Sequence, residues 1–193
     1  MLTVLSQNTS DANSGRAFEG LKQRFPTWDE VAGAPVEELA DAIRAGGIAE
    51  VKSRRIKQIL HEIEAREGSI DLSRLRRVED VDATDYLLSL PGVGAKTAAC
   101  VLVFSMGRDA FPIDTHVHRI LRRLGWIEDK TSADQAHRVI GPRIPPEIRY
   151  DLHMAFIRHG REICKPRNPR CSVCVLFDLC EAGPAFVASG EAR

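Results

Sequence analysis

Leu-Pro-Gly-Val-Gly-Ala-Lys-Thr-Ala, residues 90–98, lies between two segments with helical periodicity. Gly92 and Gly94 stand at alternate positions and permit a tight turn whose backbone amides can approach a phosphate closely. The helix that follows would present its N-terminal dipole to the same anion, with Lys96 in its first turn. The stretch therefore predicts a helix-hairpin-helix that binds phosphate. The alternative is a plain turn between two helices.

Helical signals extend from this stretch in both directions, and strand signals are almost absent. Apolar residues recur with a period of about 3.6 residues, and Ser10 and Asp114 stand where N-caps are wanted. The predicted helices cover residues 10–26, 35–46, 51–65, 84–90, 95–104, 114–124, 133–140 and 146–160, and residues 110–113 are the one extended candidate. We therefore expect an all-α fold with a small loop-rich module after about residue 161.

Composition fits an ordinary globular protein and excludes several other classes. The chain has 193 residues, of which 44% are hydrophobic and 28% charged, so wholesale disorder and collagen-like structure are excluded. The longest apolar run, residues 98–104, has seven residues, whereas a membrane-spanning helix needs about 20. No basic residue precedes Arg16 to form the start of a signal peptide. We therefore expect an unexported, cytoplasmic protein with no membrane partner.

The net charge is zero, from 27 basic and 27 acidic residues, but the charges are unevenly distributed. Residues 51–77 carry eight basic and four acidic side chains, and residues 108–170 carry 13 and eight. Folding could bring both basic stretches to one face that binds nucleic acid. The alternative is that they are ordinary solvated helix faces.

Four of the five cysteines, Cys164, Cys171, Cys174 and Cys180, lie within 17 residues. In an unexported chain, such crowding indicates a metal with soft thiolate ligands rather than disulfides. Zinc and a 4Fe–4S cluster both accept four thiolates, and the spacing alone leaves both open.

Two further features surround these cysteines. Lys165, Arg167 and Arg170 lie between the first two of them, so a bound metal would also fix a basic loop on the surface. The fifth cysteine, Cys100, stands apart on the apolar stripe of its helix, where we expect it to pack in the core.

Lys96 and Asp114 are candidate catalytic residues. A lysine amine is a nucleophile only when it is neutral, and burial together with a helix N-terminus disfavours its ammonium form. The alternative for Lys96 is a phosphate clamp, and the alternative for Asp114 is the helix cap that it can readily form. A carboxylate can serve as both cap and catalyst.

Several independent segments together resemble one known family, the endonuclease III group of helix-hairpin-helix DNA glycosylases with an iron–sulfur loop. Residues 5–11 (LSQNTSD) resemble its DNA-contacting helix start, residues 90–98 its helix-hairpin-helix, and residues 113–117 (IDTHV) its catalytic aspartate segment. The sequence His159-Gly160-Arg161 leads into four cysteines with the family's own spacing. The resemblance covers residues 5–181, nearly the whole chain.

The resemblance implies a six-helix barrel domain packed against a smaller helical iron–sulfur cluster domain, with DNA bound in the cleft between them. Residues 8–125 would form the barrel domain, and residues 1–7 and 126–193 would form the cluster domain. The cofactor would be a 4Fe–4S cluster, bound by the four cysteines. Members of the family usually begin with an additional helix on the cluster domain, so the opening at LSQNTSD leads us to expect weaker cluster retention.

The resemblance also implies a bifunctional DNA glycosylase and AP lyase of base excision repair. Lys96 matches the family's nucleophile, and Asp114 matches its essential carboxylate. Asn8 falls where the family places a residue, commonly Gln, that fills the gap left by the flipped nucleotide. Ile48 falls where a Leu usually wedges into the duplex. His116 would contact phosphate or sugar, or would only pack beside Asp114.

The expected partner is double-stranded DNA with oxidised or otherwise damaged pyrimidines or abasic sites, bound by a monomer. In a bacterium the protein would be associated with the nucleoid. Two alternatives stay open: a thymine or uracil mismatch glycosylase of the same fold, and a noncatalytic helix-hairpin-helix DNA-binding protein. The second would keep the two glycines and the basic stretches but would have no need for Lys96 with Asp114.

Overall fold

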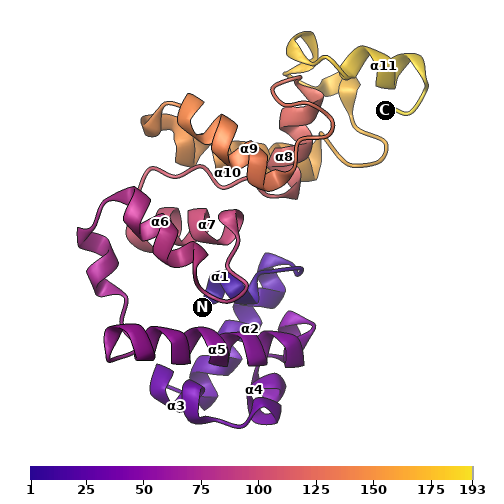
Figure 1. Ribbon diagram of the computed structural model, residues 1–193. Helices are drawn as coiled ribbons and strands as arrows, with labels where there is room; N and C mark the ends of the chain where they lie inside the picture. The colour runs from indigo at the N-terminus through magenta and orange to yellow at the C-terminus, as the bar shows by residue number, and fades with distance from the viewer. Residues whose placement is uncertain (193) are drawn as a thin grey trace. The chain divides into compact units, whose positions relative to one another are not determined.

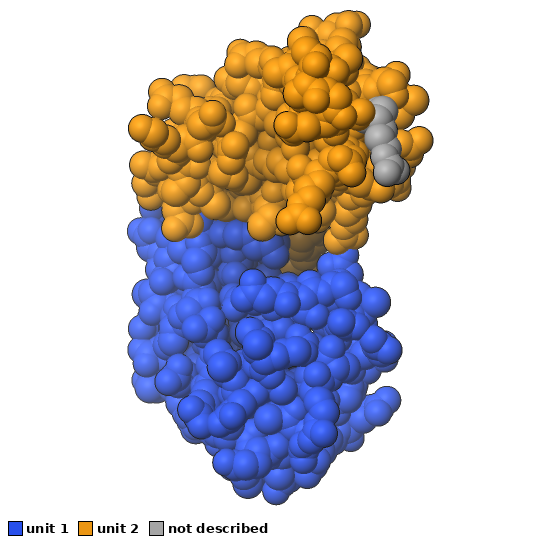
Figure 2. Space-filling model, turned by 90° about the vertical axis from the view of Figure 1, so that its right-hand side faces the viewer, with its two compact units in different colours: residues 1–101 blue, residues 102–193 orange. Residues whose placement is uncertain are grey.

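The structure of the protein is a computed structural model that describes residues 1–192. Helices are the regular elements of this part of the chain, and residues 1–192 contain no strand, which confirms the all-α prediction. No helix in the same range is long and apolar enough to cross a membrane. The chain divides into two compact units, Met1–Val101 and Leu102–Arg193, which Figure 2 shows in blue and orange.

The first unit is built around one long helix, α5 (Ala49–Glu67). Its buried face carries Ile56, Ile59, Leu60 and Ile63, which recur at helical spacing as the sequence predicts. The shorter helices α3 (Trp28–Gly33) and α4 (Val36–Ala42) pack against it (Figure 1). The other elements are α1 (Leu2–Leu5), α2 (Asp11–Arg24), η1 (Arg44–Gly46), η2 (Ser73–Arg77), α6 (Asp80–Leu88) and α7 (Ala95–Met106), of which α7 crosses the division between the units.

The second unit is built on the contact between α8 (Thr115–Arg123) and α10 (Arg149–Glu162). Its core consists of buried apolar side chains from these helices and their neighbours: Phe111, Ile113, Val117, Ile120, Leu121, Leu124, Ile127, Ala136, Ile140, Ile144 and Phe156. Cys164, Leu176 and Cys180 pack against this core from the C-terminal module. The other elements are α9 (Ala133–Ile140), η3 (Gly141–Arg143), η4 (Pro146–Ile148), η5 (Cys171–Val173), η6 (Phe177–Leu179) and α11 (Gly183–Ala188).

The predicted helices are present with shifted ends, and the differences have local causes. The helix expected from residue 84 begins at Asp80, where the N-cap Glu79 makes no side-chain cap that a sequence pattern could reveal. The extended candidate at residues 110–113 is not a strand, because the Ile113 amide donates to Nε2 of the His137 ring (2.8 Å) rather than to a neighbouring strand. The helices α1, α3 and α11 have four to six residues, too few to show a helical period.

The two compact units have other boundaries than the domains expected at residues 8–125 and at residues 1–7 with 126–193. Helix α1 packs on α2 and α5 within the first unit, and α8 packs on α10 within the second. Compactness groups residues by their packing and not by the ligand they serve. The assignment of a barrel domain and a cluster domain therefore stays a prediction.

Candidate functional site

The turn between α6 and α7 has the geometry of a hairpin that requires one of its two glycines. Gly92 has a φ of +68°, a conformation that residues with a side chain rarely adopt, and the Arg55 side chain lies against the position that a Cβ atom would take. Gly94 begins α7 by accepting a hydrogen bond from the Ala98 amide (3.0 Å), and no heavy atom lies within 4 Å of where its Cβ would be. Folding therefore explains Gly92, whereas Gly94 leaves open space beside the backbone that a ligand could approach.

Lys96 is the second residue of α7, as the sequence predicts, and it is half-buried. Its neighbour Thr97 is buried, and its Oγ1 accepts a hydrogen bond from Nε2 of Gln7 (3.1 Å). The same Gln7 amide donates to the Gly92 carbonyl (3.3 Å), and its Oε1 accepts from Nη1 of Arg55 (3.4 Å). Gln7 thus joins the hairpin, the start of α7 and α5. No local pattern in the sequence points to this role, because its partners are 48 to 90 residues away.

Asp114 is the N-cap of α8, as predicted. Its Oδ1 accepts hydrogen bonds from the backbone amides of His116 (2.9 Å) and Val117 (2.8 Å). These two bonds fix the orientation of the carboxylate, and they use only one of its two oxygens. Lys96 belongs to the first unit and Asp114 to the second, and their joint role in catalysis stays a prediction.

Asn8 and Ile48, the two residues expected to enter the duplex, share an unusual backbone. Both are exposed, and both have positive φ angles, 54° for Asn8 and 40° for Ile48. Asn8 lies in the connection between α1 and α2, and Ile48 is the N-cap of α5. A left-handed conformation is tolerated by Asn but is an outlier for a β-branched residue such as Ile.

A basic depression in the second unit brings together three of the expected DNA contacts. Its lining contains His116, Lys165 and Arg167, together with Arg161, which the sequence shows only as part of the His159-Gly160-Arg161 motif and which was not predicted to contact DNA. Nδ1 of His116 lies 3.0 Å from Nη2 of Arg119. The same Nη2 donates to the carbonyl of Gly160 on α10, so Arg119 links the His116 ring to that helix.

The loop that carries Lys165 and Arg167 is anchored by side chains of α8. Arg119 donates to the carbonyls of Gly160 and Cys164, both at 2.9 Å, and its burial lowers its pKa from the ordinary value. Arg123 donates to the carbonyls of Lys165 (2.8 Å) and Pro166 (3.1 Å). Arg170, the third basic residue between Cys164 and Cys171, is exposed but lines the neighbouring cysteine cavity instead of the basic depression.

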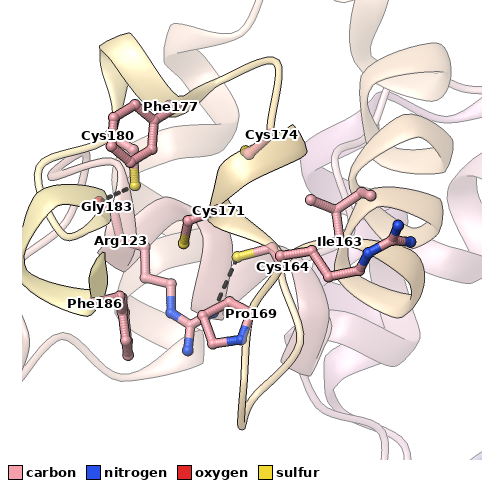
Figure 3. Close-up of a pocket in the computed structure, with 11 residues that line it drawn as sticks. Arg123, Ile163, Cys164, Pro169, Cys171, Cys174, Phe177, Cys180, Gly183 and Phe186 are labelled. Carbon is pink, nitrogen blue, oxygen red and sulfur yellow. Dashed lines mark hydrogen bonds between the residues drawn. The ribbon is translucent and has the colours of Figure 1, made fainter. Parts of the chain in front are cut away.

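The four clustered cysteines line one cavity, whose wall is mostly apolar (Figure 3). The other lining residues are Arg123, Ile163, Pro169, Arg170, Phe177, Gly183 and Phe186. Within residues 1–192, no three His, Cys, Asp or Glu side chains are grouped closely enough to hold a single ion. What the four cysteines share is therefore the cavity, and Cys100 is buried elsewhere, in the first unit, as expected.

The chemistry of this cavity fits an iron–sulfur cluster. Burial and the neighbouring cysteines raise the pKa of the Cys171 thiol, and burial raises the pKa of Cys174. Nη1 of Arg123 lies 3.1 Å from Sγ of Cys164, and the Arg123 carbonyl accepts a hydrogen bond from Sγ of Cys180 (3.2 Å). Dashed lines mark these contacts in Figure 3. Four cysteine sulfurs, a mostly apolar wall and the guanidinium of Arg123 beside the sulfurs suit a negatively charged cluster held by thiolates.

Comparison with known proteins agrees with this geometry. Residues 1–146 match the family described as HhH-GPD superfamily base excision DNA repair protein, and residues 164–180 match the iron-sulfur binding domain of endonuclease III. The second match favours the 4Fe–4S cluster over zinc. Endonuclease III of Thermotoga maritima is 37% identical over 179 residues, which are 93% of this chain and 79% of that protein.

Two further relatives add to the comparison. A protein of Arabidopsis thaliana that is provisionally named a DNA glycosylase is 38% identical over 161 residues, and the match spans 83% of this chain and 55% of that protein. Among solved structures, a trapped endonuclease III–DNA covalent intermediate is 31% identical, with a TM-score of 0.83. That match covers 96% of this chain and 83% of the other.

Proposed function

Because this chain belongs to the endonuclease III-like branch of the HhH-GPD superfamily of base excision DNA repair proteins, we propose that it excises damaged pyrimidines from duplex DNA and cleaves the strand at the resulting abasic site. The class of enzyme, a DNA glycosylase with AP lyase activity, follows from the family. The finer statement, a preference for damaged pyrimidines, is the proposal. Lys96 in the first turn of α7, directly after the hairpin, supports the lyase chemistry, and the preference for damaged pyrimidines is proposed from the likeness to endonuclease III.

The proposed chemistry uses two residues of this chain. Asp114 accepts a proton from the Lys96 ammonium, and the neutral amine attacks the sugar C1′ as the bond from C1′ to the base breaks. The base leaves with its electron pair and takes up a proton. The bond between C1′ and O4′ then breaks, O4′ takes up a proton that the amine gives up, and C1′ forms an imine with Nζ. Loss of a C2′ proton expels the 3′ phosphate, which breaks the strand, and hydrolysis of the imine returns the free amine.

Binding and distortion of the DNA are assigned to other residues. The hairpin at Gly92 and Gly94 would bind a backbone phosphate, while Ile48 would wedge into the duplex and Asn8 would fill the gap left by the flipped nucleotide. The basic depression with His116, Lys165 and Arg167 would bind the backbone on the second unit. The four cysteines would hold the 4Fe–4S cluster, whose role in this scheme is to fix the basic loop and not to take part in hydrolysis.

Covalent trapping on abasic-site DNA tests the proposal. The protein is incubated with a duplex that contains one abasic site, in the presence of borohydride, which reduces an imine to a stable amine. We expect a covalent complex with wild-type protein. A protein that binds this DNA without being trapped forms no imine, and the proposed lyase function is then wrong; base release from damaged DNA would distinguish a glycosylase without lyase activity from a noncatalytic binding protein.

A substrate panel tests the lesion preference separately. Duplexes with an oxidised pyrimidine are compared with duplexes that carry thymine or uracil opposite guanine. We expect faster excision of the oxidised base. We also expect the protein to act as a monomer, which sedimentation would show. Its site of action would be chromosomal DNA, which in a bacterium lies in the cytoplasm. Faster excision from the mismatch would instead indicate the mismatch glycosylase.

A further inference from the structure

Lys52 is a buried cation that the chemistry above does not use. It lies near the start of α5 and is only 2% exposed. Its Nζ donates hydrogen bonds to the carbonyls of Leu5 and Gly46, each at 2.7 Å. Burial lowers its pKa. Because lysines are rarely buried unless they are well paired, this position implies a specific task.

Both carbonyl groups belong to segments that lead directly into expected DNA contacts. Leu5 ends α1, three residues before Asn8, and Gly46 ends η1, two residues before Ile48. The backbone amide of Lys52 also donates to the Ile48 carbonyl (3.1 Å). One residue therefore bonds to the end of α1, to the end of η1 and to the first turn of α5.

The segments meet closely at this point. A Cβ atom on Gly46 would lie 3.1 Å from Cβ of Ala17 on α2, 3.9 Å from Nζ of Lys52 and 4.0 Å from the Leu5 carbonyl oxygen. Parts of α1, α2 and η1 thus converge around the ammonium group. The bonds of Lys52 are in the interior of this junction and do not depend on solvent-exposed contacts.

Each of the two segments that leave the junction contains a residue with a positive φ, Asn8 and Ile48, and Ile48 is the strained one. Ile48 has a φ of 40° and is 55% exposed, so the packing of its own side chain does not impose this conformation. Residues in sparsely populated backbone regions persist where the surrounding structure determines them, and they concentrate at functional sites. The side chain of Lys52 bonds to the Gly46 carbonyl, two residues before the strained residue, and its backbone amide bonds to the carbonyl of Ile48 itself.

We propose that Lys52 is a positioning residue for DNA distortion, which holds the Asn8 segment and the Ile48 segment in one rigid arrangement so that both enter the duplex together. This inference rests on the proposed function, because it uses the roles assigned there to Asn8 and Ile48. Lys52 itself touches no DNA in this scheme. Its effect is transmitted through the backbone of the two segments.

Lys57 provides a matched control on the same helix. Its Nζ also donates to a backbone carbonyl, that of Ala34, in the connection between α3 and α4. That connection carries none of the expected DNA contacts. Lys52→Met and Lys57→Met therefore remove the same charge and the same kind of bond, but only the first releases the segments that enter DNA.

The test uses a duplex with a tetrahydrofuran abasic analogue and 2-aminopurine on the opposite strand. Insertion of protein residues unstacks the 2-aminopurine and raises its fluorescence. At saturating protein, we expect the wild type and Lys57→Met to give the full rise and Lys52→Met to lose most of it. Single-turnover excision by Lys52→Met should be slower by about tenfold or more, since small misplacements of positioning groups have effects of this size.

A double-mutant cycle separates positioning from general destabilisation. In an Asn8→Ala, Ile48→Ala background, Lys52→Met should cause little further loss of excision rate, because its targets are already absent. A full fluorescence rise with folded Lys52→Met, or a rate loss that is the same in both backgrounds, would overturn the inference. Circular dichroism and melting temperatures establish that each variant is folded at the assay temperature.

Two further arrangements keep the test decisive. If Lys52→Met does not fold, Lys52→Gln takes its place. Its amide nitrogen is one bond closer to the backbone and cannot donate to both carbonyls as the ammonium does, so a full fluorescence rise with that folded variant overturns the inference. Failure of the wild type to form the borohydride-trapped complex would contradict the proposed lyase function. Trapping by the wild type together with full insertion by the Lys52 variants would contradict only the role of Lys52.

Discussion

At the scale of single residues, Lys96 is the group on which the proposed lyase chemistry depends. The imine requires its amine, whereas the fold does not, because the residue is half-buried in the first turn of α7 and Gln has a similar helix propensity. Lys96→Gln should abolish borohydride trapping and strand cleavage and leave the melting temperature nearly unchanged. Gel assays on abasic-site DNA measure both reactions, and normal cleavage by this variant would contradict the assignment.

Asp114 combines two tasks that two substitutions can separate. Asparagine keeps a side-chain oxygen that can accept the amide bonds of His116 and Val117, so Asp114→Asn should keep the stability of α8. Asp114→Ala removes the cap and should lower the free energy of unfolding by about 1 kcal/mol. Both variants should excise bases about 10²-fold or more slowly, because neither can accept a proton. Wild-type rates with Asp114→Asn would show that the residue is only a cap.

At the scale of elements, the sequence predicts what depends on near neighbours. Ser10 caps α2, Asp114 caps α8 and Gly92 adopts a positive φ, each through contacts or conformations that a short pattern describes. The four cysteines also line one cavity, as their crowding predicts. The sequence did not predict the roles of Gln7 and Lys52, because their partners are distant in the chain. Gln7 bonds to Thr97, and Lys52 bonds to Leu5, 47 residues away. A lone polar residue on a helix or loop carries no sign of such bonds.

The basic loop is the element whose contact with DNA is measured most directly by salt dependence. Each phosphate contact releases about 0.9 counterion from duplex DNA, so losing one should reduce the slope of log K against log salt by about 1. Lys165→Ala and Arg167→Ala, at the basic depression, should each have this effect, and Arg170→Ala, exposed on the same loop, should act in the same direction.

Lys130 is the comparison for these variants, because it is exposed in the second unit but lines a different depression, between α8 and α9. Lys130→Ala should leave the slope unchanged. Affinity for an abasic-site analogue is measured over a range of salt, with iron content checked for every variant. Unchanged slopes for all three loop variants would leave the loop without a role in DNA binding.

At the scale of the whole molecule, charge shows how an average can mislead. The net charge of zero gives no general attraction to DNA, yet the second unit gathers His116, Arg161, Lys165 and Arg167 around one depression. The basic stretches in the sequence anticipate this gathering, but only the anchoring of the loop by Arg119 and Arg123 explains it. The cysteine cavity and the proposed DNA-binding surface are therefore parts of one structure in the second unit.

Iron removal should consequently affect the second unit more than the first. Cys164 and Cys180 pack against the core of the second unit, whereas the first unit has its own core around α5. Protein purified without air should be straw-brown and contain about four irons per chain. Cys171→Ala should lose this iron. Amide hydrogen exchange should then become faster in α8, in α10 and in the loop between Cys164 and Cys171, while α5 keeps its protection. Cys100→Ala, which changes a buried cysteine of the first unit, should retain all the iron. A colourless protein with one zinc would refute the cluster, and equal loss of protection in α5 would refute the separate contribution of the second unit.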